Sequence, residues 1–337
     1  MWSKVKKIGM GCILSLWMLC LVSCGSGETG EQESQDVSAV QGEYVYVPTF
    51  TGMKDKGEAG FIGKIVLKGN TLYYSLNRYY DLVTMKYDSD IIKMDINAPD
   101  KEETLELQVP EIEGYNVNIS DFDVDDEGNF YVFYYISPLY EEGESYDYED
   151  VDTLFVKYDS SMQEVFRLDL EEMQLEGENI YIGAMACTKD RIYAASGDML
   201  YVLDTDGAVK KQVNARGYTI VKLFAGAEDR IFIEQYSSVS GKSELVEFDT
   251  KKNEPGAALP NLPDTNVRFA SGAPGKLLAK GDVYLYEYDL ETGEMVPIVN
   301  WLESNINCDY IMDLALLDSS YLTLCDIIVI IADEMFF

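Results

Sequence analysis

The stretch "SDFDVDDEGNFYVFYY", residues 120–135, decides the fold. Asp121, Asp123 and Asp125 alternate, and an alternating strand rich in aromatic residues follows Gly128. The acids could form a calcium loop or a tight turn between two strands. A calcium loop of the D-x-[DN]-x-[DN]-G type has glycine directly after the third ligand, whereas two further acids intervene here. The pattern therefore favours a turn, and the three aspartates stay secondary candidates in a chain for which no metal or cofactor is expected.

The same unit, a strand, an acidic or glycine turn and a second strand with an aromatic residue near its start, recurs along the chain. Its copies are KGNTLYYS (68–75), DEGNFYVF (126–133), TKDRIYAA (188–195) and AEDRIFIE (227–234), with weaker members APGKLLAK (273–280) and LDSSYLTL (317–324). A further alternating strand that runs into an Asp-led turn follows most copies: IIKMDI (91–96), LFVKYDSS (154–161), LYVLDTDG (200–207), LVEFDTKK (245–252) and LYEYDLETGE (285–294). The corresponding turns of the other copies contain KGN, KDR and EDR, and such different residues could not all bind a cation.

A period of about 40 to 60 residues is typical of propellers and related arrays. Each unit supplies about four short strands with period-2 alternation, separated by turn residues. One such sheet cannot cover both of its faces, but sheets packed radially around an axis can. The sequence therefore predicts an all-β protein, a β-propeller of about six four-stranded blades over residues 42–325, with the last blade incomplete.

The start of the chain predicts its compartment. Lys4, Lys6 and Lys7 precede an apolar stretch over residues 8–22, which is the layout of a secretory signal peptide. It ends in LVSC (21–24), which resembles the lipobox of bacterial lipoproteins. We therefore expect residues 1–23 to be removed and Cys24 to carry the lipid that holds the protein on the outer face of the bacterial cell membrane. The alternative is an ordinary signal peptide with an incidental cysteine.

Composition separates the regions on either side of the predicted propeller. Residues 24–41 are small, polar and acidic without an aromatic residue, which is typical of a flexible tether. Residues 326–337 form an apolar tail that is too short to span a bilayer and has no Asp-led turn. Its window IIVII (327–331) has the composition that aggregates when exposed. We expect the chain to be a fragment of a longer protein, or to be altered near its end.

Charge and composition exclude several kinds of function. With 60 acidic against 26 basic residues, the net charge is −34, which makes nucleic acid a poor partner. The chain has no histidine, so the usual base of a Ser or Cys nucleophile and the commonest zinc ligand are missing. The cysteines beyond Cys24 are Cys187, Cys308 and Cys325, whose spacing matches no zinc motif. We expect them to be buried apolar residues.

Carboxylate-only catalysis stays open, because glycoside hydrolysis needs only an acid and a second carboxylate. Propeller sialidases require an arginine cluster, and this chain has six arginines in all and no S-x-D-x-G-x-x-W box. A glycan-cleaving enzyme is therefore the alternative to a binding protein.

Aromatic residues outside the repeat are the ligand-binding candidates, since aromatic rings stack on sugars. Tyrosines at repeat positions are expected to pack between blades instead. Off the repeat lie NRYYDLVTMKYD (77–88) and the long insertions over residues 137–152 and 299–310, which are either binding elements or solvated loops. The candidates in these segments are Tyr79, Tyr80, Tyr140, Tyr146, Tyr148 and Trp301.

The combination of LVSCG (21–25), the acidic tether, EYVYVPTF (43–50), YDLETGE (288–294) and NWLESNIN (300–307) resembles a group of lipoproteins from Gram-positive gut bacteria. In that group a propeller precedes the extracellular solute-binding domain of an ABC importer, usually one for sugars. The resemblance implies a non-catalytic surface module that binds a glycan, a peptide or a surface protein during nutrient uptake, with importer components as partners. No solute-binding domain follows here, so a structural spacer is a third alternative.

Overall fold

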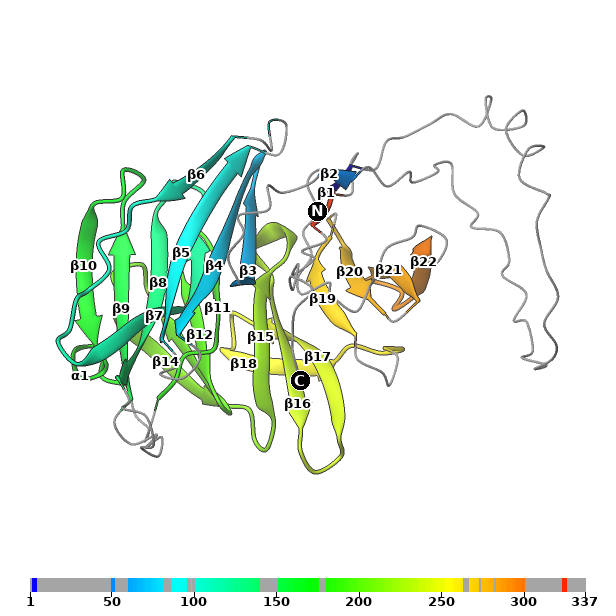
Figure 1. Ribbon diagram of the computed structural model, residues 1–337. Coiled ribbons are helices and arrows are strands. Elements are labelled where there is room, and N and C mark those ends of the chain that lie inside the picture. The colour runs from blue at the N-terminus through cyan, green and yellow to red at the C-terminus, as the bar shows by residue number, and fades with distance from the viewer. Residues whose placement is uncertain are drawn as a thin grey trace, which may run out of the picture.

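The structure is a computed structural model that describes residues 2–4, 50–51, 60–81, 86–95, 98, 101–139, 151–175, 180–262, 267–272, 274–281, 283–300 and 323–325. These residues form an all-β propeller of five four-stranded antiparallel sheets, with one further three-stranded sheet (Figure 1). Within this part of the chain the only helical segments are α1 (Leu170–Met173) and a single 3-10 turn, η3 (Ala227–Asp229). None of the described helices is long and apolar enough to cross a membrane.

Each four-stranded sheet, here called a blade, is built from four consecutive strands. Blade 1 contains β3 (Gly60–Lys68), β4 (Thr71–Asp81), β5 (Lys86–Asp95) and β6 (Glu102–Leu105). Blade 2 contains β7 (Tyr115–Val124), β8 (Phe130–Pro138), β9 (Asp152–Tyr158) and β10 (Glu164–Asp169). Blade 3 contains β11 (Ala184–Cys187), β12 (Ile192–Ser196), β13 (Met199–Leu203) and β14 (Val209–Asn214). Blade 4 contains β15 (Thr219–Ala225), β16 (Ile231–Ser237), β17 (Lys242–Asp249) and β18 (Glu254–Ala258). Blade 5 contains β19 (Arg268–Ser271), β20 (Lys276–Lys280), β21 (Tyr284–Asp289) and β22 (Met295–Asn300).

The predicted repeat is confirmed for these five blades, because each of its first five copies falls on the hairpin between the first and second strands. The predicted number of about six blades is too high for the described residues. From the sixth copy and its surroundings only β23 (Thr323–Cys325) is described, and it joins a small sheet instead of a blade of its own. Its partner is β1 (Trp2–Lys4), which also pairs with β2 (Phe50–Thr51).

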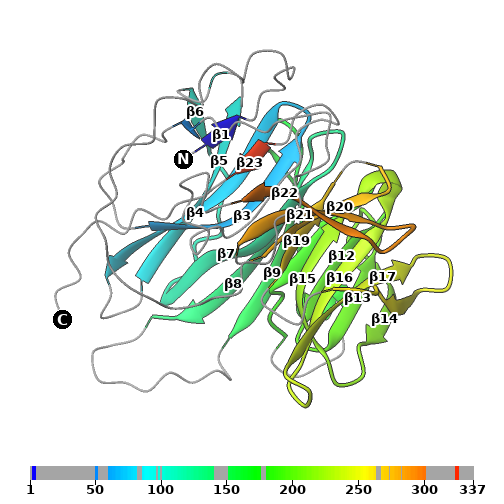
Figure 2. The same ribbon diagram turned by 90° about the vertical axis from the view of Figure 1, so that its right-hand side faces the viewer.

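The first strands of successive blades lie next to one another: β3 beside β7, β7 beside β11, β11 beside β15, and β15 beside β19. Figure 2 shows β3, β7, β15 and β19 near the middle of the molecule, with β6 and β14 farther out. The side chains of these first strands therefore reach both the neighbouring blade and the central space of the propeller.

The core lies between blades, and blade 2 shows why the sequence produces this arrangement. Along β8, Phe130, Val132 and Tyr134 pack against blade 1, while Tyr131 and Phe133 pack toward blade 3. All five are at most 1% exposed. Since burying one large apolar side chain contributes about 1.5–3 kcal/mol, an alternating strand with apolar residues on both faces stabilises two interfaces.

Asp-led turns close the hairpins between the third and fourth strands of blades 2 to 5, as the sequence predicts. In each of them the Oδ1 atom of the aspartate accepts hydrogen bonds from backbone N–H groups two to four residues later. The aspartates are Asp159, Asp204, Asp249 and Asp289.

Candidate functional site

A cavity of about 300 Å³, here called the funnel, opens between the first strands of the blades. Its wall comes from β3, β4, β7, β11, β15, β19 and the residues just before β11. A second cavity of about 190 Å³ shares Lys64, Lys222 and Leu223 with it. The polar and charged side chains of the funnel are those of Lys64, Ser75, Asn77, Ser120, Asp121, Tyr181, Lys222 and Arg268.

Backbone irregularities in three of the first strands lie at the funnel. The pairing register shifts between Ile62 and Ile65 in β3, and between Ile119 and Asp121 in β7. It shifts again in β15, on either side of Val221. A β-bulge turns a side chain away from the regular alternation of its strand, and such bulges often border functional sites. The residues inside these three shifts, Gly63, Lys64, Ser120 and Val221, all line the funnel.

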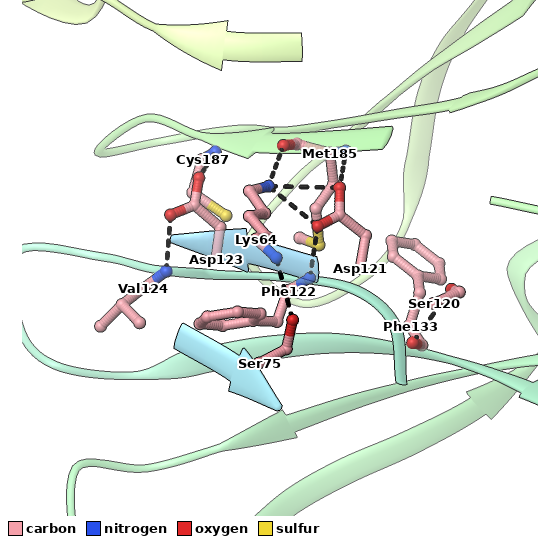
Figure 3. Close-up of polar contacts among 10 residues, drawn as sticks. All are labelled: Lys64, Ser75, Ser120, Asp121, Phe122, Asp123, Val124, Phe133, Met185 and Cys187. Atoms are coloured by element: carbon pink, nitrogen blue, oxygen red, sulfur yellow. Dashed lines mark hydrogen bonds and ion pairs between the residues drawn. The ribbon is translucent and has the colours of Figure 1, made fainter. Parts of the chain in front are cut away.

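Lys64 on β3 and Asp121 on β7 form a partly buried ion pair at the wall of the funnel (Figure 3). Lys64 Nζ lies 3.0 Å from Asp121 Oδ1 and donates to the backbone carbonyl of Met185 at 2.6 Å. Asp121 Oδ2 also accepts from the backbone N–H of Met185 at 2.6 Å. One lysine and one aspartate thereby join blades 1, 2 and 3.

The environment of this pair acts on both groups. Burial raises the pKa of the Asp121 carboxyl to about 6, although the Lys64 ammonium and two backbone N–H groups act in the opposite direction. Burial acts to lower the pKa of Lys64, but the charges of Asp121 and Asp123 raise it above its ordinary value. The pairing therefore favours the charged form of Lys64, while burial makes the Asp121 carboxyl easier to protonate than an exposed one.

The other two aspartates of the acidic stretch have different partners. Asp123 Oδ2 accepts from the backbone N–H of Cys187 in blade 3 at 2.7 Å. Asp125 begins the predicted turn: its carboxylate accepts from the backbone N–H groups of Glu127 and Asn129, the Asn129 side chain and the Tyr131 hydroxyl. The three carboxylates therefore do not converge on one point, and no group of three or more potential metal ligands occurs among the described residues.

Blades 4 and 5 are joined at the funnel by a similar set of contacts. Lys222 Nζ on β15 donates to the backbone carbonyl of Phe269 on β19 at 2.9 Å. Arg268 on β19 donates from Nη1 to Glu234 Oε1 on β16 at 3.3 Å. Burial raises the pKa of Glu234, with the charges of Arg268 and Lys222 acting against it. Glu234 is 2% exposed, and its Oε2 is among the few buried side-chain atoms of the described chain without a hydrogen-bond partner.

An aromatic ring lies at the wall of the funnel. Tyr181 is 46% exposed and lines the cavity. Its ring meets that of Tyr135 edge to face, with 5.1 Å between the ring centroids. The funnel thus combines cations, hydroxyl and amide groups and one aromatic surface.

The predicted ligand-binding and lipidation residues stay predictions. Tyr79 and Tyr80 lie in β4. Cys24, Tyr140, Tyr146, Tyr148 and Trp301 lie outside the described residues. Of the predicted buried cysteines, Cys187 is 3% exposed, as expected.

Sequence reasoning missed the cations of the funnel. A signal for two of them was present, because Lys64 and Lys222 each interrupt an apolar first strand, in FIGKIVL (61–67) and TIVKLFA (219–225). Their common place in the repeat indicates a shared position in the fold. Arg268 and Tyr181 have no comparable signal, because the folded arrangement of the blades brings them to the cavity.

No protein-family model matches the sequence. No curated protein matches it. Among solved structures, the chain is similar to a protein of unknown function from Bacteroides caccae, with 10% sequence identity and a TM-score of 0.48 over 77% of this chain and 87% of that chain. It is also similar to the Dos1 propeller (14% identity, TM-score 0.39, 70% of this chain and 64% of that chain) and to a puromycin hydrolase (11% identity, TM-score 0.41, 71% and 46%). This chain thus spans less than two thirds of the second structure and less than half of the third, and the similarities concern the fold alone.

Proposed function

We propose that the chain is a lipoprotein of the outer face of a bacterial membrane, anchored through Cys24, whose propeller is a non-catalytic binding module for nutrient capture. The observation that carries the binding role is the funnel, a cavity whose cations come from three different blades: Lys64 from β3, Lys222 from β15 and Arg268 from β19. A small polar ligand held there would contact several blades at once, as ligands in concave sites do. Importer components are the proposed partners of the anchored protein.

The carboxylates near the funnel favour a binding role over a catalytic one. Glycoside hydrolysis needs one carboxylic acid and one carboxylate that both face the scissile bond. Asp121 is bonded to Lys64 and to the backbone N–H of Met185 in the next blade. Glu234 is almost completely buried and contacts Arg268. Each acid is therefore already part of a contact between blades.

A panel of ligands separates the proposed binding module from the two alternatives. The mature chain, with Cys24→Ser to keep it soluble, is tested for retention on glycan and peptide arrays, and for release of new reducing ends from the retained glycans. We expect retention of one ligand class without turnover. Release of reducing ends at a rate proportional to protein concentration would establish the glycan-cleaving enzyme. Binding to nothing on either array would favour the third alternative, a structural spacer.

A further inference from the structure

We infer that the funnel selects a small hydroxylated carboxylate of the hexuronate type, a sugar ring that carries one carboxylate group. This inference rests on the proposed binding role and adds the ligand class. The ligand could be a free uronate or the end of an acidic glycan chain, since both present the same carboxylate and hydroxyl groups.

The charge of the funnel is opposite to that of the protein. The whole chain has a net charge of −34, yet the lining of the funnel contains three cations, Lys64, Lys222 and Arg268, and a single carboxylate, Asp121. One further carboxylate, that of Glu234, contacts Arg268 from outside the lining, so the cations still outnumber the carboxylates. A concave site of one sign concentrates ligands of the opposite sign, because the protein walls screen charges less than water does. The lining therefore favours an anion, although the overall charge of the protein repels one at long range.

Arg268 is the cation best placed to contact such an anion. Its side chain is 54% exposed, whereas that of its partner Glu234 is 3% exposed. A guanidinium group has five N–H donors in a planar fork, and the contact with Glu234 uses Nη1. The fork matches the two oxygens of a carboxylate, which favours a carboxylate over a spherical anion.

Two glycines keep the wall of the funnel open. A Cβ atom on Gly63 would lie 2.8 Å from Ser75 Oγ and 3.2 Å from Asn77 Nδ2, and one on Gly183 would lie 3.1 Å from the ring of Tyr181. Neither glycine has a positive φ, so close approach and not backbone conformation favours glycine at both positions. Ser75 and Asn77 are 4% and 6% exposed and line the cavity beside Gly63, where Ser75 Oγ also accepts from the backbone N–H of Lys64. The ring of Tyr181 lines it beside Gly183.

These groups are suited to a sugar ring. Serine hydroxyl and asparagine amide groups exchange hydrogen bonds with hydroxyl groups. The half-exposed ring of Tyr181 offers an apolar face against which the C–H groups of a sugar can pack. A cavity of about 300 Å³ is at the lower end of the range for small-molecule sites, which corresponds to one or two sugar units.

Calorimetric titration of the Cys24→Ser mature chain tests the inference with five probes: D-galacturonate, its methyl ester, D-galactose, acetate and inorganic phosphate. We expect galacturonate to bind about ten-fold or more tightly than the ester or galactose, because only galacturonate has the charge that Arg268 and Lys222 complement. Acetate and phosphate lack the ring and are expected to bind more weakly than galacturonate. Trigalacturonate distinguishes the two possible ligands. If it binds more tightly than galacturonate, the natural ligand is the end of an acidic glycan chain. If the two bind equally, the natural ligand is a free uronate.

Variants at Val221 locate the site without removing a contact between blades. Val221 is 40% exposed, lies at the bulge of β15 and lines the funnel. Val221→Glu adds a negative charge there, and Val221→Gln is the neutral control of similar shape. We expect the acidic variant to bind galacturonate about ten-fold or more weakly than the neutral one, since like charges a few ångströms apart repel strongly. Galactose affinity should be the same in both.

Two results would overturn the inference and can be distinguished. If galactose, acetate or phosphate binds as tightly as galacturonate, or if Val221→Glu and Val221→Gln bind galacturonate equally, the ligand class is wrong while the binding role stands. If no probe binds here and the arrays of the preceding section also retain nothing, the binding role itself is wrong.

Discussion

The carboxylate of Asp121 on β7 accepts a hydrogen bond from the backbone N–H of Met185 on β11, 64 positions later in the chain, with 2.6 Å between the oxygen and the nitrogen. Asp123 repeats the contact with the backbone N–H of Cys187. The acidic stretch of β7 thus joins two blades through side-chain acceptors and backbone donors. The first strands of neighbouring blades do not pair with each other in a sheet, so these backbone N–H groups find no backbone acceptor in the next blade. The two carboxylates accept their hydrogen bonds instead.

Asp121→Asn should destabilise the fold markedly. The neutral amide leaves the Lys64 ammonium without its ion-pair partner, and breaking a buried or partly buried pair on one side costs about 3–5 kcal/mol. Urea denaturation of the variant and the parent chain measures the difference in the free energy of unfolding.

Asp126→Asn is the matched control for that variant. The Asp126 side chain is 79% exposed and pairs with Lys68 at the surface. Loss of an exposed pair is expected to change the free energy of unfolding by about 0–1 kcal/mol. Equal effects of the two substitutions would show that the ion pair between Lys64 and Asp121 does not stabilise the protein.

Asp125→Ala tests the turn. The substitution removes an acceptor of four hydrogen bonds, and the expected cost is about 1–2 kcal/mol, similar to the loss of a helix cap. Calcium should leave the melting temperature of both the parent and the variant unchanged, because the carboxylates of this stretch do not converge. A rise of many degrees with calcium in the parent that is absent from Asp125→Ala would instead establish a cation site.

Acid should weaken the fold partly through the Asp-led turns. Hydrogen bonds from the side chain and the backbone N–H of Lys252 lower the pKa of Asp249 from its ordinary value of 3.8 to about 2. The Lys276 side chain likewise lowers the pKa of Asp289. A carboxyl whose pKa is lower in the folded state contributes stability above its unfolded pKa and loses it as the pH falls.

The free energy of unfolding should therefore decrease between about pH 4 and pH 2, and Asp249→Asn should show a smaller decrease than the parent. Chemical denaturation at several pH values in this range measures how the free energy of unfolding of the parent and of the variant changes with pH. Identical slopes for the parent and the variant would mean that Asp249 has the same pKa in the folded and unfolded states.

Lipidation depends on Cys24 in the proposed function. Since the thiol of this residue is the predicted site of acylation, Cys24→Ala should leave an uncleaved precursor that does not incorporate a palmitate analogue in bacterial cells. Ser23→Ala, which keeps a small residue before the predicted cleavage site, is the control and should label like the parent. Labelling of Cys24→Ala at the parental level would rule out the anchor.

The fold was largely predictable because the repeat is a local signal. Strand alternation and Asp-led turns depend on residues close in sequence, so copies such as residues 126–133 and 188–195 could be aligned and placed on hairpins. The number of blades was not, because residues 323–325 follow the local pattern of the repeat but join a small three-stranded sheet instead of a blade of their own. The local pattern of a short segment does not show which strands it pairs with.

The funnel was not predictable for a related reason. The local pattern places Asp121 in a calcium loop or just before a turn, but its partners Lys64 and Met185 lie 57 and 64 positions away. The bulges at Ser120 and Val221 shift by one residue the alternation of side chains between the two faces of the strand. A shift of one residue cannot be recognised from the periodicity of the sequence. Long-range contacts and single-residue bulges thus define the site, while local patterns define the blades.

The most direct test of the binding role is the affinity of the best ligand from the arrays for Val221→Trp compared with Val283→Trp. The two valines are 40% and 39% exposed, but only Val221 lines the funnel. An indole at position 221 should fill the cavity and abolish binding, whereas the same substitution at position 283 should leave the affinity and the melting temperature at parental values. Retained binding in Val221→Trp, with loss or no change in Val283→Trp, would contradict the account and place the ligand elsewhere on the propeller.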